Sequence, residues 1–242
     1  MGCKIIITAG GTSEKIDDVR KITNTASGKL GFTIANKLIQ EKGIFINKIY
    51  YICTKAAYKP NNKKIEIIEI IDTIDLQNVI TKLLTKEKID YFIHSMAVSD
   101  YTVDYVTTAE KLSSAIENNN PYEIICNYKD GIKDSKISSN EDNLIIKLKK
   151  TPKIISSIKN ISPNTFLVGF KLLNNVSENK LIDVALELKN KNSCNIIVAN
   201  DLKNISGDNH KAFIIKDKNN YITAFTKEDI AIKLINELPL DA

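Results

Sequence analysis

The sequence has few of the residues from which metal centres, disulfide frameworks and nucleic-acid surfaces are usually built. Its four cysteines lie far apart without a C-x-x-C pair, and only two histidines accompany them. No zinc-site spacing is present, so we expect free, partly buried thiols in the reducing cytoplasm. Arg20 is the single arginine and the lysines are dispersed, so the net charge of +5 does not indicate nucleic-acid binding.

Long apolar runs are also absent. The run after Lys4 ends at Ile7, which is too short for a secretory signal, and no run reaches the about 18 residues of a membrane span. With 43% hydrophobic and 26% charged residues, a chain of 242 residues is typical of a folded globular protein. We expect one domain over residues 1–242 and no membrane partner.

Short β-branched or aromatic runs alternate with helical patterns along most of the chain. The apolar runs predict strands at 4–7, 49–53, 64–70, 91–98, 166–170 and 195–200. The helical patterns lie at 28–43, 73–88 and 177–192. This alternation predicts an α/β fold of modified Rossmann-like type, with a mostly parallel sheet flanked by helices.

Two segments depart from that alternation. Residues 212–217 and 221–225 predict an edge hairpin, followed by a last helix at about 227–238. Residues 102–150 predict an excursion from the sheet, with a short helix near 108–118 and an apolar run at 144–150. We interpret the excursion as a flap, a partner-binding arm, or both.

The segment TAGGTSEKIDDVRKITNTASGKLG at 8–31 holds four of the nine glycines. In an open parallel sheet, ligands bind beyond the carboxyl ends of the strands, where Gly10 and Gly11 would let the backbone turn and approach a ligand. The N–H groups of a helix that begins near Gly28 would suit a phosphate. Alternatively, Gly28 and Gly31 only allow close helix-to-strand packing, and the helix is capped by Thr23, Asn24 or Ser27.

Familiar nucleotide motifs do not account for this segment. SGKLG lacks the upstream glycine and the following hydroxyl of a Walker loop, and no G-x-G-x-x-G follows the first strand. Tyr51 and Lys55 have the Y-x-x-x-K spacing of a short-chain dehydrogenase, but four residues along a strand span about 13 Å. They could not act together as they would one turn apart on a helix.

The segment at 8–31 closely resembles the opening signature of phosphopantothenate–cysteine ligases, T-x-G-G-T-x-E-x-I-D-x-V-R-x-I-T-N-x-S-x-G. Later blocks are similar to the same family in the same order: HSMAVSDY at 94–101, KISS at 136–139, LKKTPKII at 148–155, VGFKLL at 168–173 and IVANDL at 197–202. The free-standing bacterial form of the ligase is the better match.

The resemblance implies an enzyme of coenzyme A biosynthesis that joins 4′-phosphopantothenate to L-cysteine. CTP, in bacterial members, or ATP, in animal members, activates the acid with Mg²⁺. The family is homodimeric with sites completed across the interface, which makes the 102–150 excursion the candidate dimerisation arm. Because the first strand begins at Lys4, we also expect a separate flavin-dependent decarboxylase to act next.

Three catalytic residues are implied by the resemblance. Asn24 would contact the substrate carboxylate or the acyl intermediate as a neutral donor, unless it is only a helix N-cap. Lys136 would meet the triphosphate; outside the KISS block it would be taken as solvated surface. The planar fork of Arg20 suits a phosphate, and its alternative is a surface ion pair with Asp17 or Asp18.

The remaining site residues are implied to contact the nucleotide: Gly10, Gly11, His94, Ser95, Met96, Asp100, Lys136, Pro152, Lys153, Ile154, Ile155, Phe170 and Lys191. Asp100 would face the ribose or base, or else sit in a turn. The His94 ring is expected to be a hydrogen-bonded strand histidine rather than a catalyst, and Phe170 could equally be a core residue. No protein ligand for a metal is predicted.

The chain departs from the fused members of the family at two places. Ser138 and Ser139 replace two lysines of a K-I-K-K block, and Glu187 occupies the first of two lysine positions, so Lys189 or Lys180 is the candidate substitute. Two rival functions remain: a nucleotide or pantothenate sensor without catalysis, and an oxidoreductase on the same fold. Nucleotide preference is left open by the sequence.

Overall fold

Strands from both ends of the chain build one eight-stranded sheet in the computed structural model, which describes residues 2–117, 119–207 and 209–240. Along the sheet the order is β12-β11-β10-β9-β6-β1-β4-β5. The parallel strands are β1 (Cys3–Ala9), β4 (Ile46–Thr54), β5 (Ile65–Ile70), β6 (Tyr91–His94), β9 (Phe166–Leu173) and β10 (Ile196–Ser206). At one edge β11 (Asn209–Asp217) and β12 (Asn220–Thr226) run antiparallel to their neighbours.

The chain order reverses at the centre of this sheet. From β1 the sheet grows through β4 to β5 on one side and through β6 and β9 to β10 on the other. Such a reversal opens a crevice at the carboxyl ends of the two central strands, here β1 and β6. The fold therefore places its ligand crevice where the glycine segment follows β1.

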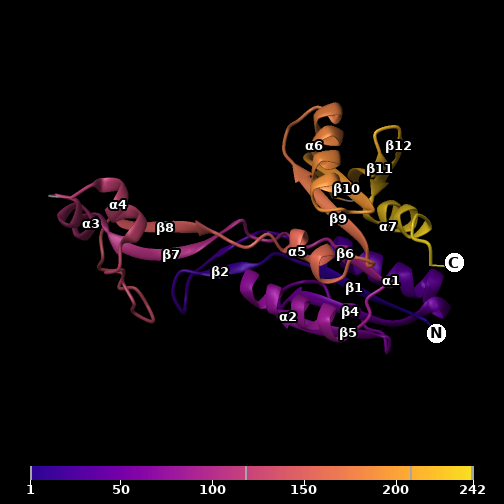
Figure 1. The fold of residues 1–242 in the computed structure, drawn as a ribbon, viewed down its shortest axis with the longest axis horizontal. Helices are drawn as coiled ribbons and strands as arrows, with labels where there is room; N and C mark the ends of the chain where they lie inside the picture. Colours follow the sequence, from indigo (N-terminus) through magenta and orange to yellow (C-terminus); the bar gives the residue numbers. More distant parts are fainter. Residues whose placement is uncertain (1, 118, 208, 241–242) are drawn as a thin grey trace.

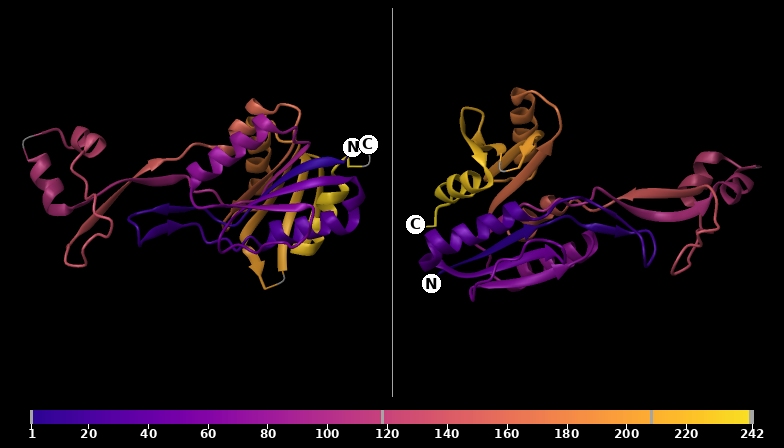
Figure 2. Two further views of the ribbon diagram at one scale, coloured as in Figure 1. Left: turned by 90° about the horizontal axis from the view of Figure 1, so that it is seen from below. Right: turned by 180° about the vertical axis from the view of Figure 1, so that it is seen from behind.

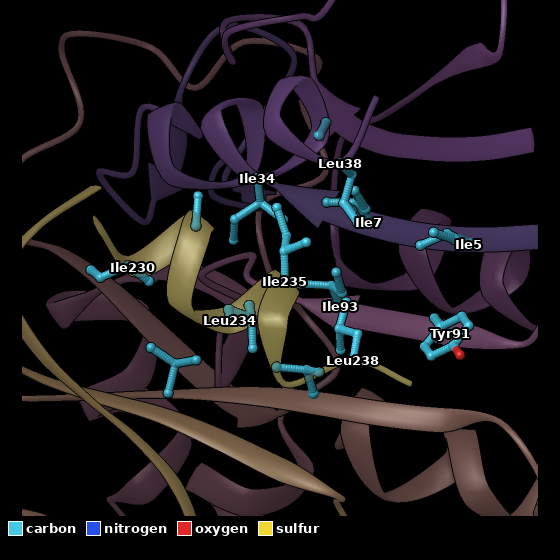
Figure 3. Close-up of a cluster of buried hydrophobic side chains, with 14 of the residues drawn as sticks. Ile5, Ile7, Ile34, Leu38, Tyr91, Ile93, Ile230, Leu234, Ile235 and Leu238 are labelled. Carbon is cyan, nitrogen blue, oxygen red and sulfur yellow. The ribbon is translucent and has the colours of Figure 1, made fainter. Parts of the chain in front are cut away.

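Helices cover both faces of the sheet. On one face, α1 (Lys29–Lys42) and α7 (Lys227–Asn236) pack together over alternate residues of β1, and α1 ends in the 3₁₀ turn η1 (Gly43–Phe45). Ile34 and Ile235 meet Ile7 in this fully buried core (Figure 3). On the other face lie α2 (Thr73–Lys86), α5 (Ile154–Ile161) and α6 (Glu178–Lys191). Strand residues thus alternate between two apolar cores, as parallel strands buried on both sides do.

A long arm projects from the sheet (Figures 1 and 2). Its stem is the antiparallel pair β7 (Tyr101–Thr108) and β8 (Leu144–Lys150), and its far end carries α3 (Ala109–Ile116) and α4 (Pro121–Asn127). The predicted excursion at 102–150 is confirmed as this arm. Its role as a flap or dimerisation element stays a prediction.

A short hairpin, β2 (Ser13–Lys15) and β3 (Lys21–Thr23), extends from the same region of the sheet beside the root of the arm (Figure 1). At its base the Ser13 N–H donates to the carbonyl of Ile71, and the buried Glu14 carboxylate accepts from the N–H and hydroxyl of Thr73. Those contacts fasten the hairpin to the first turn of α2. The glycine segment is therefore a folded ligand-side element and not a simple loop.

The predicted fold class is confirmed, together with the edge hairpin and the last helix. The sequence patterns did not predict strands β2, β3 and β7, the turn η1, or helices α4 and α5. The strand predicted at 91–98 ends at His94, because Ala97 leaves the sheet to form a bridge with Gly11. Polar residues dominate β2 and β3, and so hide the period of two that identifies a half-buried strand.

The cysteines are free, as predicted. Cys53 and Cys194 are buried, which raises the pKa of each thiol to about 11, while Cys126 is exposed at the end of α4. Within the described residues, no helix is long and apolar enough to cross a membrane.

Candidate functional site

The floor of the site is formed where β1 and β6 end. The Thr8 hydroxyl lies 2.8 Å from Nδ1 of His94 and accepts from the N–H of Met96 at 3.3 Å. The Ser95 hydroxyl donates to the carbonyl of Thr8 at 2.6 Å. Burial lowers the pKa of His94 to about 4, so its ring is neutral at pH 7. His94 is thus a buried, hydrogen-bonded strand residue, as expected.

Asn24 lies directly over Gly11 at the base of the hairpin. Its Nδ2 donates to the carbonyl of Ala97 at 3.2 Å, and its own N–H donates to the carbonyl of Thr12. A Cβ built on Gly11 would lie 2.0 Å from the Asn24 carbonyl oxygen, so only glycine allows this approach. Gly10, at φ +91°, makes the preceding turn. Since α1 begins at Lys29 behind Gly28, Asn24 is not its N-cap.

At two helix N-termini near this floor the N-cap residue gives no side-chain cap, although the Ser27 hydroxyl accepts a long bond, 3.4 Å, from the N–H of Lys29 in α1. Gly28, in the left-handed region, is the N-cap of α1, and Lys153 is the N-cap of α5. Side-chain oxygens cap the other α-helices in the described residues: α2, α3, α4, α6 and α7. Uncapped N–H groups at a helix start favour an anion. Gly31 serves the predicted close packing, because a Cβ there would lie 2.8 Å from Ala9 Cβ and Ser95 Oγ.

The root of the arm is tied to the same floor. The Thr151 hydroxyl donates to the carbonyl of Ser99 at 2.5 Å, and the Ser99 N–H donates to the Thr12 hydroxyl at 2.9 Å. Beside them the exposed Asp100 carboxylate pairs with Lys153. Pro152 to Ile155 thus form the entry to α5, a helix that the sequence patterns did not reveal. The Lys153 pair places this segment next to Asp100, and the nucleotide contact that the resemblance implied for it stays a prediction.

Arg20 and Lys136 come together at the hairpin tip. Arg20 is paired with Asp17, with Nη2 2.7 Å from Oδ2, so the alternative ion pair is the one observed. Nη2 also donates to the carbonyl of Ile137 at 2.6 Å. Lys136 directly precedes Ile137, so it lies at the hairpin tip and not at the base beside Asn24, with its side chain exposed.

A cleft of about 320 Å³ opens between the hairpin and the carboxyl ends of β1, β4 and β5. It is lined by Gly11, Asn24 and several hydroxyl-bearing residues, together with the ammonium-bearing side chains Lys21 and Lys55. Sequence reasoning did not select these two lysines, because dispersed lysines are common in this chain. The position of Lys55 could have identified it, because it directly follows β4 at the edge of the parallel sheet where ligands bind.

Of the predicted site residues, Gly11 and Asn24 line this cleft and the others do not. Phe170 is half-buried on β9, against the core under α1 and α7. Lys191 lies in the last turn of α6, a helix that runs antiparallel to the strands, so it sits at their amino ends. Its contact with the nucleotide stays a prediction. Of the candidate substitutes, Lys180 in the first turn of α6 lies at the carboxyl edge, whereas Lys189 does not.

A second cleft, of about 250 Å³, lies between the start of α6 and the ends of β10 and β11. No predicted site residue lines it. Its floor includes the buried carboxylate of Asp201, which accepts from the N–H groups of Asn175, Val176 and Lys203. Because these three bonds already satisfy the Asp201 carboxylate, it is a structural group of the loop. We therefore take the first cleft, and not this one, as the candidate functional site.

The arrangement provides neutral donors, uncapped helix starts and exposed cations around one edge of the sheet. Within residues 2–117, 119–207 and 209–240, no group of three His, Cys, Asp or Glu side chains could hold a metal ion. A set of this kind can bind anionic ligands and stabilise negative charge that develops on them.

Comparisons with known families agree with this geometry. The profile of the DNA/pantothenate metabolism flavoprotein C-terminal domain matches residues 1–127 and 106–239. The coenzyme A biosynthesis bifunctional protein CoaBC of Methanocaldococcus jannaschii is 29% identical over 240 residues, and that of Thermococcus kodakarensis 28% over 238. Each alignment covers 98% of this chain. The chain spans about half the length of these relatives, 50% and 51% respectively.

Solved structures are similar over the whole chain. The DNA/pantothenate metabolism flavoprotein from Streptococcus pneumoniae is 40% identical, with a TM-score of 0.85 and 98% of both chains covered. The Cab2 mutant H337A in complex with phosphopantothenate-cysteine has a TM-score of 0.65 at 15% identity, over 97% of this chain and 86% of that one. At that identity, the second likeness concerns the fold alone.

Proposed function

The chain belongs to the family of the DNA/pantothenate metabolism flavoprotein C-terminal domain, and from this premise we propose that it is a phosphopantothenate–cysteine ligase. The reaction joins 4′-phosphopantothenate and L-cysteine in coenzyme A biosynthesis, with CTP as the activating nucleotide. One observation carries the proposal: Asn24 is held over Gly11 in a cleft at the carboxyl ends of β1 and β4. The ordered sequence blocks of the ligases support it.

The chemistry requires charge control at two places. A carboxylate does not react with an amine at neutral pH, because its oxygen is a poor leaving group. Attack of the substrate carboxylate on the α-phosphate of CTP forms an acyl-cytidylate and releases pyrophosphate. The cysteine amine then attacks the acyl carbon, loses a proton and displaces CMP. The first step needs cations near the leaving pyrophosphate, and the second needs a donor near the acyl oxygen.

Asn24 supplies the donor in this proposal. One N–H of its amide is bonded to the Ala97 carbonyl, which fixes the side chain and leaves the second N–H for the acyl oxygen. A neutral amide stabilises developing negative charge without a permanent ion pair. Lys21 and Lys55, which line the same cleft, would meet the 4′-phosphate at the other end of the substrate.

The nucleotide would lie along the β6 side of the crevice. The backbone at Ser95 and Met96 and the uncapped starts of α1 and α5 favour a phosphate-bearing ligand there. Asp100 suits the ribose or base, because an acid does not favour a triphosphate. Lys136 would neutralise the departing pyrophosphate, from this chain's hairpin tip or from that of a partner copy.

Mg²⁺ is compatible with these residues. Mg²⁺ bound with a nucleotide is held largely by phosphate oxygens and water, so a preformed protein cage is not required. The ion would neutralise phosphate charge when bound, and no residue of the chain is assigned to it.

The arm supports a homodimer. Leu144, Ile146 and Leu148 lie at alternate positions of β8 and are 36%, 38% and 40% exposed, so one face of the arm presents an apolar stripe. A second copy of the chain is the proposed partner. Free thiols fit a cytoplasmic enzyme, and the carboxyl group of the product's cysteine makes a flavin-dependent decarboxylase the proposed next enzyme.

Pyrophosphate release tests the proposal. The purified protein is incubated with Mg²⁺ and 4′-phosphopantothenate, with CTP or ATP, and with or without L-cysteine. Cysteine-dependent turnover with CTP is expected. Turnover with ATP but not CTP would support the ligase activity and change the proposed nucleotide. Ligand binding without pyrophosphate release from either nucleotide would indicate a non-catalytic sensor and contradict the catalytic roles of Asn24 and Lys136.

A further inference from the structure

A buried carboxylate lies at the tip of the β2–β3 hairpin. The Asp17 side chain is 1% exposed, and its two oxygens have different partners. Oδ1 accepts from the N–H groups of Val19 and Arg20, at 2.9 and 2.6 Å, and so closes the turn. Oδ2 accepts from Nε of Arg20 at 2.9 Å and from the N–H of Ile137 at 3.1 Å. One oxygen serves the turn and the other reaches a loop 120 residues away.

The bonds to the loop fix both neighbours of Lys136. The Asp18 N–H donates to the carbonyl of Ser135 at 2.9 Å, and Arg20 Nη2 donates to the carbonyl of Ile137 at 2.6 Å. The Ile137 side chain is 2% exposed, whereas the Lys136 side chain points to solvent. No ion pair of Lys136 occurs in the part of the chain that the structure describes. The loop is therefore held by its backbone while the ammonium group stays available.

We propose that Asp17 is a positioning residue of the ligase: with Arg20 as its counter-ion, it holds residues 135–137 on the hairpin tip so that Lys136 is presented to the nucleotide from one place. The inference rests on the proposed function for the role of Lys136, but the clamp itself does not. It also changes the role of Arg20. Both Nε and Nη2 are engaged within the protein, so Arg20 bridges two segments rather than offering its fork to a substrate.

The charge state of Asp17 agrees with this role. Burial raises the pKa of the carboxyl group, but the hydrogen bonds from Arg20, Val19 and Ile137 outweigh burial and hold the pKa well below its ordinary value. Asp17 is therefore ionised throughout the neutral range, and charge-assisted bonds of this kind are the stronger ones.

Asp17→Asn separates the two halves of the contact. The amide keeps one acceptor oxygen, which can close the turn, but it places an NH₂ group against the Ile137 N–H and the Arg20 guanidinium. The turn also retains its own backbone bond, from the Ile16 N–H to the Arg20 carbonyl at 2.9 Å. Asp18→Asn is the matched control, since its side chain is 67% exposed and its nearest ammonium, on Lys15, is 3.9 Å away.

The first measurement is amide hydrogen exchange of residues 133–139 in the ligand-free protein. Asp17→Asn is expected to speed exchange of the Ile137 N–H at least about tenfold, and Arg20→Lys to do so more weakly, with Asp18→Asn unchanged. Thermal unfolding shows whether each variant remains folded. Wild-type protection at Ile137 in a folded Asp17→Asn protein would overturn the clamp, whatever the enzyme does.

The second measurement is a double-mutant cycle on pyrophosphate formation at saturating substrates. Asp17→Asn is expected to slow this step about tenfold in the wild-type background and less than about twofold in a Lys136→Ala background, because the two residues act through one group. If the rate effects of Asp17→Asn and Lys136→Ala instead multiply in the double variant, Asp17 does not act through Lys136, and the proposal is overturned. If no variant, including wild type, releases pyrophosphate, the proposed function fails and the exchange result alone decides whether the clamp exists.

Discussion

At its base the β2–β3 hairpin is fixed to the sheet by backbone contacts that need glycine, whereas its tip is fixed to the arm's loop by one buried carboxylate. The base holds Asn24 against Gly11 and Ala97, and the neutral His94 lies 2.8 Å from the hydroxyl of Thr8 on the strand that leads into it. The tip holds Lys136 through Asp17. In the proposed ligase, the amide donor Asn24 is thus held on the sheet, whereas the cation Lys136 is carried on a loop that Asp17 holds in place.

The largest effect is expected from Gly11→Ala at the base. The added Cβ would lie 2.0 Å from the Asn24 carbonyl oxygen, so the hairpin base must move. We expect a loss of about 3 kcal/mol in the free energy of unfolding and a loss of ligase turnover. Denaturant unfolding and pyrophosphate release measure the two effects.

Gly43→Ala is the control for that substitution. Nothing lies within 4 Å of a Cβ at Gly43, and its backbone is in the right-handed helical region at φ −55°. Alanine there should leave turnover intact and raise stability by up to about 1 kcal/mol. Equal stability losses at both positions would contradict the steric account of the base.

Acid should weaken the base before the tip. His94 has a pKa near 6.5 when unfolded and about 4 when folded, so the unfolded state binds the proton first. Stability from its neutral form is complete above pH 6.5 and falls as the pH drops to 4, by about 2 kcal/mol at pH 5. The depressed pKa of Asp17 means that its contribution is present above about pH 4 and is lost only below.

Denaturant unfolding between pH 7 and pH 5 checks this order. His94→Gln should lower stability at pH 7 but flatten its dependence on pH in that window. The protection factor of the Ile137 N–H, which is corrected for the intrinsic pH dependence of exchange, should not change over the same window. Loss of protection at Ile137 by pH 5 in a folded protein would contradict the prediction that the hairpin base loses stability at a higher pH than the tip.

The smallest effect concerns the cleft beside the base. Lys55→Ala should raise KM for 4′-phosphopantothenate about fivefold and leave kcat nearly unchanged, because an exposed ammonium contributes about 1 kcal/mol to binding. Lys82→Ala, on the solvent side of α2, is the matched control. An unchanged KM in the Lys55 variant would show that the 4′-phosphate does not bind beside Lys55.

The central sheet could be predicted from sequence because its strands are apolar on both faces, as in Ile5, Ile6 and Ile7, and alternate with amphipathic helices. The hairpin could not, since β3 is exposed at every residue. Helix α5 was not predicted because Pro152 and Lys153, which precede it, are typical of a loop. Elements that depend on long-range contacts leave little local pattern.

The candidate site shows the same division. Gly10 and Gly11 could be selected because a glycine turn after the first strand has a local physical reason, whereas Asn24 was selected through the resemblance to the ligases. The partner of Arg20 could be anticipated, as Asp17 lies three residues away. The role of Asp17 could not, because its bond to Ile137 joins segments 120 residues apart. The position of Lys191 in the last turn of α6 could not be read from its block, and its contact stays a prediction.

The central claim is that the base acts on the acyl group and the tip on the nucleotide's phosphates. Rapid-quench single turnover with CTP and 4′-phosphopantothenate, followed by addition of cysteine, tests it most directly. Lys136→Ala should slow pyrophosphate formation about a hundredfold while Lys133→Ala, in the same exposed loop, does not. Asn24→Ala should fold normally yet fail to accumulate or resolve the acyl-cytidylate. Wild-type turnover in Asn24→Ala, or an unchanged rate of pyrophosphate release in Lys136→Ala, would contradict the account.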